Sequence, residues 1–164
     1  MNAYAKAIAV ALLFYSFSFL SSCSADKTQD EVYVGAPQIY HEVEDEILLL
    51  INQHRISKNL VPLKKLELAK EQASNHCSHM LEANEVCHHF FGERERELKN
   101  NDAIAVGENV AFGFHTAEGV VNAWLKSNSH RRNIEGDFTA SGISAIKDAE
   151  GNFYYTHIFV KEEN

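Results

Sequence analysis

The sequence has no basic run longer than the pairs Lys64-Lys65 and Arg131-Arg132, and its 164 residues carry a formal net charge of −8. Proteins that bind nucleic acids normally show a basic face or stripe, because they must neutralise backbone phosphates. Internal repeats and low-complexity segments are also absent from the sequence. With 45% hydrophobic and 23% charged residues, the composition is that of an ordinary globular domain. We therefore expect one domain with its own core and no nucleic-acid partner.

Long hydrophobic runs are lacking as well. The apolar stretch at 7–20 has fourteen residues and follows Lys6, whereas a transmembrane helix needs about 20. A short apolar run after a basic residue is typical of a signal peptide. We therefore predict that residues 1–22 are a signal peptide.

Cysteine is scarce, and one of the three cysteines, Cys23, stands two serines after the end of this run. The segment 20–23, Leu-Ser-Ser-Cys, resembles a bacterial lipobox, in which the cysteine is acylated and becomes the new N-terminus. The alternative is an ordinary cleaved signal followed by a chance cysteine. The lipobox favours a lipid anchor at Cys23 that holds the protein to a bacterial membrane in an extracytoplasmic location. The polar segment 23–39 is then a flexible tether, and residues 40–164 form the domain.

The remaining cysteines, Cys77 and Cys87, leave two interpretations open. An exported protein can form a disulfide between them, and free cysteines can also pack as small buried hydrophobic residues. The surrounding stretch SNHCSHMLEANEVCHH contains four histidines: His76, His79, His88 and His89. It lacks a paired C-x-x-C, and helical spacing points His79 away from Cys77, so we expect no separate zinc site here. His76 lies on an alanine-lined helix face and is predicted to be a core histidine bonded to a backbone carbonyl.

Hydrophobic periodicity predicts both helices and strands. The predicted helices are 40–60, 66–84 and 116–127, the predicted hairpin strands are 141–147 and 152–161, and 103–114 is expected to be irregular or a short strand. Small alanines on the inner face of the second helix indicate close packing against a flat surface such as a sheet. The pattern indicates an α+β fold with a sheet between helical layers.

Seven spaced motifs carry a resemblance to a known family. In chain order they are INQHR, VPLKKLELA, ASNHCSHM, CHHFFGER, GENVAFG, VVNAWLKSNSHRRNI and FTASGIS. Their order and spacing resemble the CAP superfamily, also called SCP-like, over roughly residues 43–160. GEN alone is weak, but GEN with a tryptophan helix that runs into S-x-x-H-R-x-N-I is specific. The resemblance implies a three-layer α-β-α sandwich with an antiparallel sheet between helices.

The resemblance also implies a cleft in which two histidines and two acidic residues converge, sometimes around a divalent cation. The histidines match His88 and His130, and one acid matches Glu108. Ser127 stands where animal and plant members have the second acid. In the last strand, His157 follows Thr where bacterial relatives tend to have Gln.

Two neutral imidazoles and a carboxylate suit a zinc-like divalent cation, with positions left for water. Because Ser127 replaces a carboxylate, we expect weak binding. His157 adds a third nitrogen ligand if its side chain faces the cleft. The other interpretation is a polar network that fixes loops around a wet cleft, and both interpretations stay open. Asn133, close to His130, is expected to hydrogen-bond backbone.

These residues support three hypotheses of function. The favoured one is an envelope-anchored binding module whose cleft takes a divalent cation, a small amphiphilic ligand or a cell-wall ligand. The second is a metal-assisted or serine hydrolase of peptide or cell-wall material, because Ser127, His130 and Glu108 supply the groups of a Ser-His-acid arrangement. No G-x-S-x-G motif frames Ser127, which serves equally well as a helix cap. The third is a domain that binds an envelope protein through its outer surface, with a vestigial cleft.

Overall fold

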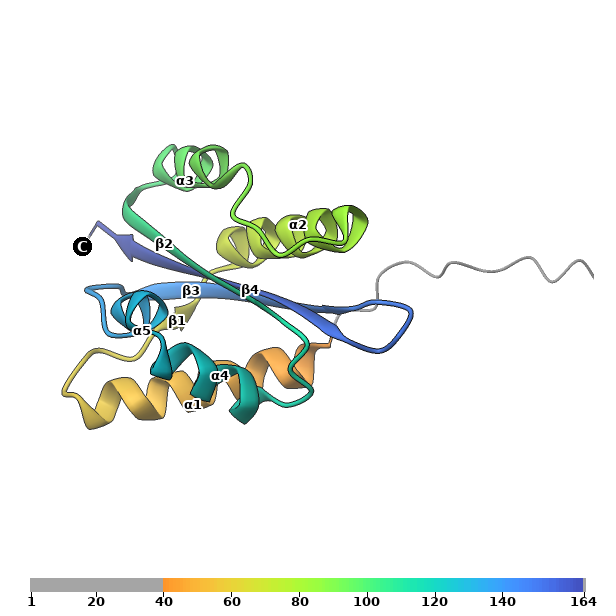
Figure 1. Ribbon diagram of the computed structural model, residues 1–164. Helices are drawn as coiled ribbons and strands as arrows, with labels where there is room; N and C mark the ends of the chain where they lie inside the picture. The colour runs from red at the N-terminus through yellow and green to blue at the C-terminus, as the bar shows by residue number, and fades with distance from the viewer. Residues whose placement is uncertain (1–39, 164) are drawn as a thin grey trace, which may run out of the picture. The chain divides into compact units, whose positions relative to one another are not determined.

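The computed structural model describes residues 40–163, which form an α+β fold as predicted. The elements are α1 (His41–Ser57), β1 (Lys64–Lys65), α2 (Glu67–Ala83), α3 (Phe91–Lys99), β2 (Ala103–Phe112), α4 (Ala117–Lys126), α5 (Asn128–Ile134), β3 (Ala140–Lys147) and β4 (Phe153–Glu162) (Figure 1). The predicted signal peptide, the anchor at Cys23 and the tether lie outside the described residues. Within 40–163, no helix is both long enough and apolar enough to span a membrane.

The sheet has the strand order β1-β3-β4-β2. The predicted hairpin is present, with β3 antiparallel to β4, and β2 pairs antiparallel with the other side of β4. The sheet is antiparallel as expected, except that the two-residue strand β1 pairs parallel with β3. The segment 103–114, expected to be irregular or a short strand, forms the ten-residue strand β2, which has a register shift between Ala103 and Ala105 and lies at the edge of the sheet.

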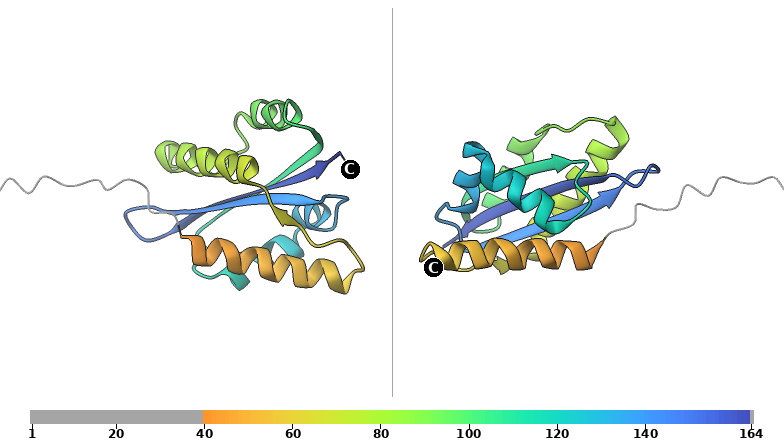
Figure 2. Two further views of the ribbon diagram at one scale, coloured as in Figure 1. Left: turned by 180° about the vertical axis from the view of Figure 1, so that it is seen from behind. Right: turned by 60° about the horizontal axis from the view of Figure 1, so that its bottom comes forward.

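Helices cover both faces of the sheet, which gives the three layers that the family resemblance implies. α2 and α3 lie on one side, and α1, α4 and α5 lie on the other (Figures 1 and 2). α2 packs closely because Ala69 and Ala73 are fully buried on its inner face. Gly142 of β3 is required there, since a Cβ at this position would overlap the backbone of Lys70.

The core beneath the opposite face is built from aliphatic and aromatic side chains of α1, α4 and β4. Ile47, Ile51, Trp124, Tyr155 and Phe159 are at most 1% exposed. The indole Nε1 of Trp124 donates to the carbonyl of Val110 in β2 at 3.1 Å, so the one buried polar atom of the ring is satisfied. This contact ties α4 to the strand that carries the GEN motif.

A buried arginine fixes the segment between α5 and β3. Arg55 of α1 is 1% exposed. Its guanidinium donates at 2.7–2.9 Å to the carbonyls of Val61, Ile134, Gly136 and Phe138. Burial lowers the pKa of Arg55, and the carboxylate of Asp137 partly offsets that effect. No sequence pattern indicated this role, because a basic residue in the last turn of a helix is normally exposed there.

Candidate functional site

The three cleft residues named by the motifs come from three different segments. His88 lies in the loop between α2 and α3, Glu108 lies on β2, and His130 lies on α5. Glu108 shares a strand face with Val106 and Val110, which pack against side chains of α2 and β4. Its side chain therefore points to the α2 and α3 side of the sheet. The site lies at the free edge of the sheet, where β2 has no further strand beside it.

Glu108 is the centre of a buried hydrogen-bond network. Its Oε1 lies 2.8 Å from Nδ1 of His88 and accepts from Nη2 of Arg94 at 2.9 Å, and its Oε2 accepts from Nε of Arg94 at 2.8 Å. Nε2 of His76 lies 3.9 Å away. The Glu108 side chain is 2% exposed, so the guanidinium neutralises its charge where water cannot.

Arg94 is the functional residue that sequence reasoning missed. It is 6% exposed, and besides Glu108 it donates Nη1 to the carbonyl of His89 at 2.7 Å. The sequence feature that could have indicated it is spacing. Arg94 lies four residues before Leu98, so the two share a helix face, and both are buried in α3. A single arginine on the apolar face of a short helix indicates a buried partner of opposite charge.

The two histidines of the cleft differ in exposure. The His88 side chain is 53% exposed, whereas His130 is partly buried. Burial lowers the pKa of His130, and the nearby His88 lowers it further when protonated. His130 is therefore a neutral imidazole at pH 7. Its backbone carbonyl accepts from Nδ2 of Asn109, which ties α5 to β2 at 3.1 Å.

Asn133 holds α5 against the edge strand, as predicted for a backbone-bonding residue. Its Nδ2 donates to the carbonyl of Glu108 at 3.0 Å and to Oδ1 of Asn109 at 2.8 Å. An edge strand leaves backbone groups without a partner strand, and the Asn133 amide satisfies one of them. Together with His88, Phe91, Val106, Gly107 and Glu108, Asn133 lines an open pocket of about 280 Å³.

The serine hydrolase arrangement is not formed. Ser127 ends α4 and precedes α5, and its Oγ hydrogen-bonds Oγ of Ser129 at 3.0 Å. Within residues 40–163, the Glu108 carboxylate bonds His88 and Arg94, and no bond joins it or Ser127 to the His130 ring. Both links that a Ser-His-acid relay needs are therefore missing. The alternative interpretation of Ser127, as a residue at a helix junction, agrees with its position.

His157 does not face the cleft, so the condition for its role as a third ligand is not met. It is 0% exposed and lies on the sheet face opposite to Glu108, with its ring centroid 3.9 Å from that of Phe159 and 6.0 Å from that of Trp124. Neither ring nitrogen has a hydrogen-bond partner among the described residues. Burial lowers the pKa of His157 to about 3, with a smaller contribution from Arg55. His157 is a neutral core residue.

The two cysteines of the domain are free thiols, so the disulfide alternative is wrong. Cys77 is completely buried between α2 and the sheet, with Sγ 3.3 Å from Oγ1 of Thr156 and 3.4 Å from the carbonyl of Ser144. Burial raises its pKa to about 12. His76 is the predicted core histidine, with Nε2 donating to the carbonyl of Cys87 at 2.7 Å.

The cleft residues fit a resident divalent cation poorly. The Glu108 oxygens already accept hydrogen bonds from Arg94 and His88, and a cation would have to compete with the guanidinium for them. In the described part of the chain, one set of three candidate ligands has its atoms within 4.8 Å of one another, and it is a different set: His79, Cys87 and His89. The histidine-rich stretch, in which the sequence spacing predicted no separate zinc site, thus brings three candidate ligand atoms together.

The three layers and the His/Glu pocket at the edge of the sheet define an α-β-α sandwich domain with a polar edge site. The family model of CAP, described as the Cysteine-rich secretory protein family, matches residues 48–160. The chain belongs to this family, as its motifs predicted.

Bacterial proteins are among the relatives. The chain is 30% identical over 129 residues to the uncharacterized protein YkwD of Bacillus subtilis (strain 168), covering 76% of this chain and 49% of that protein. It is 29% identical over 123 residues to the uncharacterized membrane protein YlbC of the same strain, covering 72% of this chain and 34% of that protein. The chain thus spans a third to a half of the length of these curated relatives.

Solved structures share the fold. An outer surface protein from Borrelia burgdorferi superposes with a TM-score of 0.71 at 22% identity, covering 79% of this chain and 99% of that chain. An extracellular protein containing a SCP domain from Bacillus anthracis str. Ames superposes with a TM-score of 0.63 at 25% identity, covering 74% of this chain and 41% of that chain.

Proposed function

We propose that this protein is an extracytoplasmic binding module whose pocket at the edge of β2 takes a small ligand with both polar and apolar parts. The observation that carries the proposal is the Arg94–Glu108–His88 network. The buried ion pair fixes the carboxylate, and the carboxylate fixes the half-exposed His88 ring through Nδ1.

The hydrogen bonds define what the pocket offers a ligand. Since Nδ1 of His88 donates to Glu108, the tautomer leaves Nε2 as an acceptor. A ligand hydroxyl or amide N–H fits that acceptor, and the side chains of Phe91 and Val106 offer apolar contact beside it. Sugars and peptides of cell-wall material carry such donors, and amphiphiles combine them with an apolar part. Binding through fixed polar groups needs no catalytic nucleophile, which agrees with the position of Ser127.

The location forms part of the same proposal. The relative from Bacillus anthracis is described as extracellular, and the segment 20–23 of this chain has the lipobox pattern with Cys23 as the acylated residue. Labelling of cells with a palmitate analogue tests the anchor. Incorporation that is lost in Cys23→Ala, together with release of the protein from the membrane fraction, supports it. Equal labelling of both forms contradicts it.

Ligand binding is tested by ¹⁵N–¹H NMR of the full chain titrated with soluble peptidoglycan fragments and with short-chain lipids. We expect saturable shifts at Gly107 and Asn133, and loss of binding in His88→Ala. His115→Ala is the matched control, because His115 is an exposed histidine outside the pocket. Two results would contradict the proposal and favour a domain that binds through its outer surface. One is saturable binding without chemical-shift changes at the pocket residues, and the other is binding that is unchanged in His88→Ala.

We further propose that a divalent cation binds this pocket only weakly. Isothermal titration with zinc in a Cys87→Ser background, which removes the thiol of the neighbouring cluster, isolates the cleft. The additional substitutions His88→Ala and His130→Ala should then abolish a small heat of zinc binding. Equal heats before and after this change would exclude the cleft as a cation site.

A further inference from the structure

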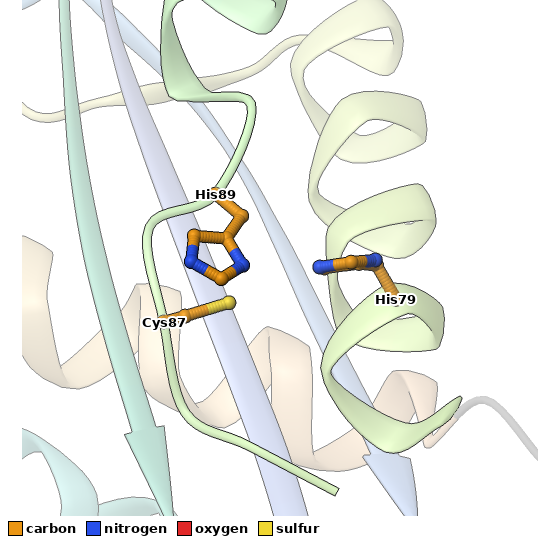
Figure 3. A group of neighbouring side chains, drawn as sticks. All are labelled: His79, Cys87 and His89. Carbon is orange, nitrogen blue, oxygen red and sulfur yellow. The ribbon is translucent and has the colours of Figure 1, made fainter. Parts of the chain in front are cut away.

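We propose that His79, Cys87 and His89 form a transition-metal site, with zinc as the preferred ion, separate from the cleft of His88 and Glu108. One ligand atom from each of the three lies within 4.8 Å of the other two. Figure 3 shows the Cys87 and His89 side chains extending from the loop after α2 toward the ring of His79 on that helix.

The local backbone explains why these residues converge. α2 ends at Asn84, whose left-handed conformation (φ 50°) turns the chain back along the helix. The following residues 85–88 belong to no helix or strand and form the loop that carries Cys87 and His88. Cys87 and His89 lie toward His79 (Figure 3), whereas Nδ1 of His88 between them lies 2.8 Å from the Glu108 carboxylate.

Two buried side chains hold the loop in this position. Nε2 of His76 donates to the carbonyl of Cys87 at 2.7 Å, and Nη1 of Arg94 donates to the carbonyl of His89 at 2.7 Å. The backbone of each loop ligand is thus fixed by its own donor.

Phe90 also indicates that the loop is held under constraint. Its φ is 61°, a left-handed conformation that is unfavourable for a bulky side chain. Its ring contacts the edge of the His79 ring, with centroids 5.2 Å apart. A strained residue persists where its surroundings fix it, and such residues cluster at ligand-binding sites.

One of the three ligands has a buried nitrogen without a hydrogen bond. Nε2 of His79 is buried and has no partner among residues 40–163. A buried ring nitrogen without a partner is destabilising. A metal ion would accept the lone pair of this nitrogen.

The donor set favours a particular class of ion. Two imidazoles and a thiolate suit borderline-soft ions such as Zn²⁺ rather than Mg²⁺ or Ca²⁺. In a tetrahedral zinc site neighbouring ligand atoms lie about 3.3–3.8 Å apart, so ligand atoms that lie up to 4.8 Å apart must approach one another on binding. His89 is exposed, so rotation of its side chain can supply this movement. Coordination releases the Cys87 thiol proton to solvent, and a water fills the fourth position.

The surroundings provide a route for a cation. His79 and Phe90 border an open groove of about 520 Å³ between α2 and α3. Three carboxylates line the same groove: Glu71, Glu93 and Glu97. Its one cationic residue, Arg94, is neutralised by Glu108. The groove is therefore net negative, which raises the local concentration of cations.

Titration with Co²⁺ tests the proposal, because a thiolate bound to Co²⁺ gives a near-ultraviolet charge-transfer band. The full chain is used with Cys23→Ala in every sample, so that only Cys77 and Cys87 can supply sulfur. We expect one Co²⁺ per chain, visible bands of a four-coordinate ion, and displacement by Zn²⁺. Cys87→Ser should abolish the charge-transfer band.

His89→Ala should weaken binding by at least about 10-fold, and because His89 is exposed this variant is expected to fold. Circular dichroism checks folding of each variant. His115→Ala, which replaces an exposed histidine outside both sites, is the matched control and should leave the titration unchanged. The thiolate band separates this site from the cleft, because no cysteine lines the cleft. A charge-transfer band that persists in Cys87→Ser, affinity unaffected by His89→Ala, or the absence of a band in the parent protein would overturn the proposal.

Discussion

The guanidinium of Arg94 holds the carboxylate of Glu108 at two points, with Nε 2.8 Å from Oε2 and Nη2 2.9 Å from Oε1. The two side chains are 7% and 2% exposed, so the pair is shielded from solvent. The same pair orients His88 through the carboxylate and the backbone of His89 through the guanidinium. One ion pair therefore positions residues of both the cleft and the neighbouring histidine–cysteine cluster.

Replacement of Arg94 by Met should strongly destabilise the domain, because it leaves the Glu108 carboxylate buried without its partner. We expect the free energy of unfolding to fall by about 3–5 kcal/mol. Urea denaturation followed by circular dichroism measures it. Arg96→Met is the matched control on an exposed position of α3 and should change stability by less than about 0.5 kcal/mol. The double variant Arg94→Met/Glu108→Leu should recover part of the loss, because it also removes the unpaired carboxylate. A loss equal to the sum of the losses in Arg94→Met and Glu108→Leu would contradict the coupling of the two residues.

Arg55→Lys should not replace the native arginine, although it keeps the charge. Four carbonyls accept hydrogen bonds from the planar guanidinium, and a lysine ammonium has neither the number of donors nor their fork geometry. We expect a loss of at least about 3 kcal/mol in the free energy of unfolding. Lys58→Arg, just beyond the end of the same helix, is an exposed control. A thermal unfolding midpoint for Arg55→Lys equal to that of the unmodified protein would show that the four bonds are dispensable.

His157 should give the domain a specific sensitivity to acid. Its pKa is about 3 in the folded chain and returns to its ordinary value of 6.5 on unfolding. Between these values the unfolded chain binds a proton that the folded chain does not. The stabilising contribution is therefore complete above pH 6.5 and is lost as the pH falls toward 3, by about 1.4 kcal/mol per pH unit.

The variant His157→Phe removes this proton and keeps an aromatic ring in the core. Denaturant unfolding at pH 7 and pH 5 measures the free energy of unfolding of both proteins. Between pH 7 and pH 5 the unmodified protein should lose about 1–2 kcal/mol more than the variant. His115→Phe, at an exposed position, should keep the acid sensitivity of the unmodified protein. Parallel pH profiles for His157→Phe and the unmodified protein would show that His157 carries no such linkage.

The two thiols of the domain should differ in reactivity and should not be joined. Burial raises the pKa of Cys77 to about 12, which leaves almost no thiolate at pH 8. In the full chain with Cys23→Ala, we expect a thiol reagent to modify Cys87 before unfolding and Cys77 only after it. Mass spectrometry of the modified peptides determines the order in which the two cysteines react. Detection of a Cys77–Cys87 peptide in a non-reduced digest would contradict the free thiols of the structure.

Much of the fold could be predicted from the sequence, because it depends on local patterns. Apolar residues at helical spacing indicated α1, α2 and α4. Two stretches of alternating side chains on either side of the turn DAEG (148–151) indicated the hairpin of β3 and β4. The order of the motifs around GEN and HR indicated the family, and the family model confirms it. The roles of His76 and Asn133 followed from residue type and neighbours, since each completes a hydrogen bond to backbone.

The tertiary structure alone decided which polar side chains meet. His157 and Glu108 lie on adjacent strands of one sheet, yet they face opposite layers, and local patterns do not determine which layer holds the cleft. Arg94 finds its partner fourteen residues along the chain, across the turn between α3 and β2. His79 meets Cys87 and His89 because Asn84 reverses the chain, and because His76 and Arg94 fix the returning loop. The sequence by itself determined α1, α2, α4 and the hairpin of β3 and β4, because these follow from local periodicity, whereas α3, α5 and β1 were not predicted from it. The convergence of these side chains depends on contacts between residues distant in the chain, and such contacts exist only once the layers have packed.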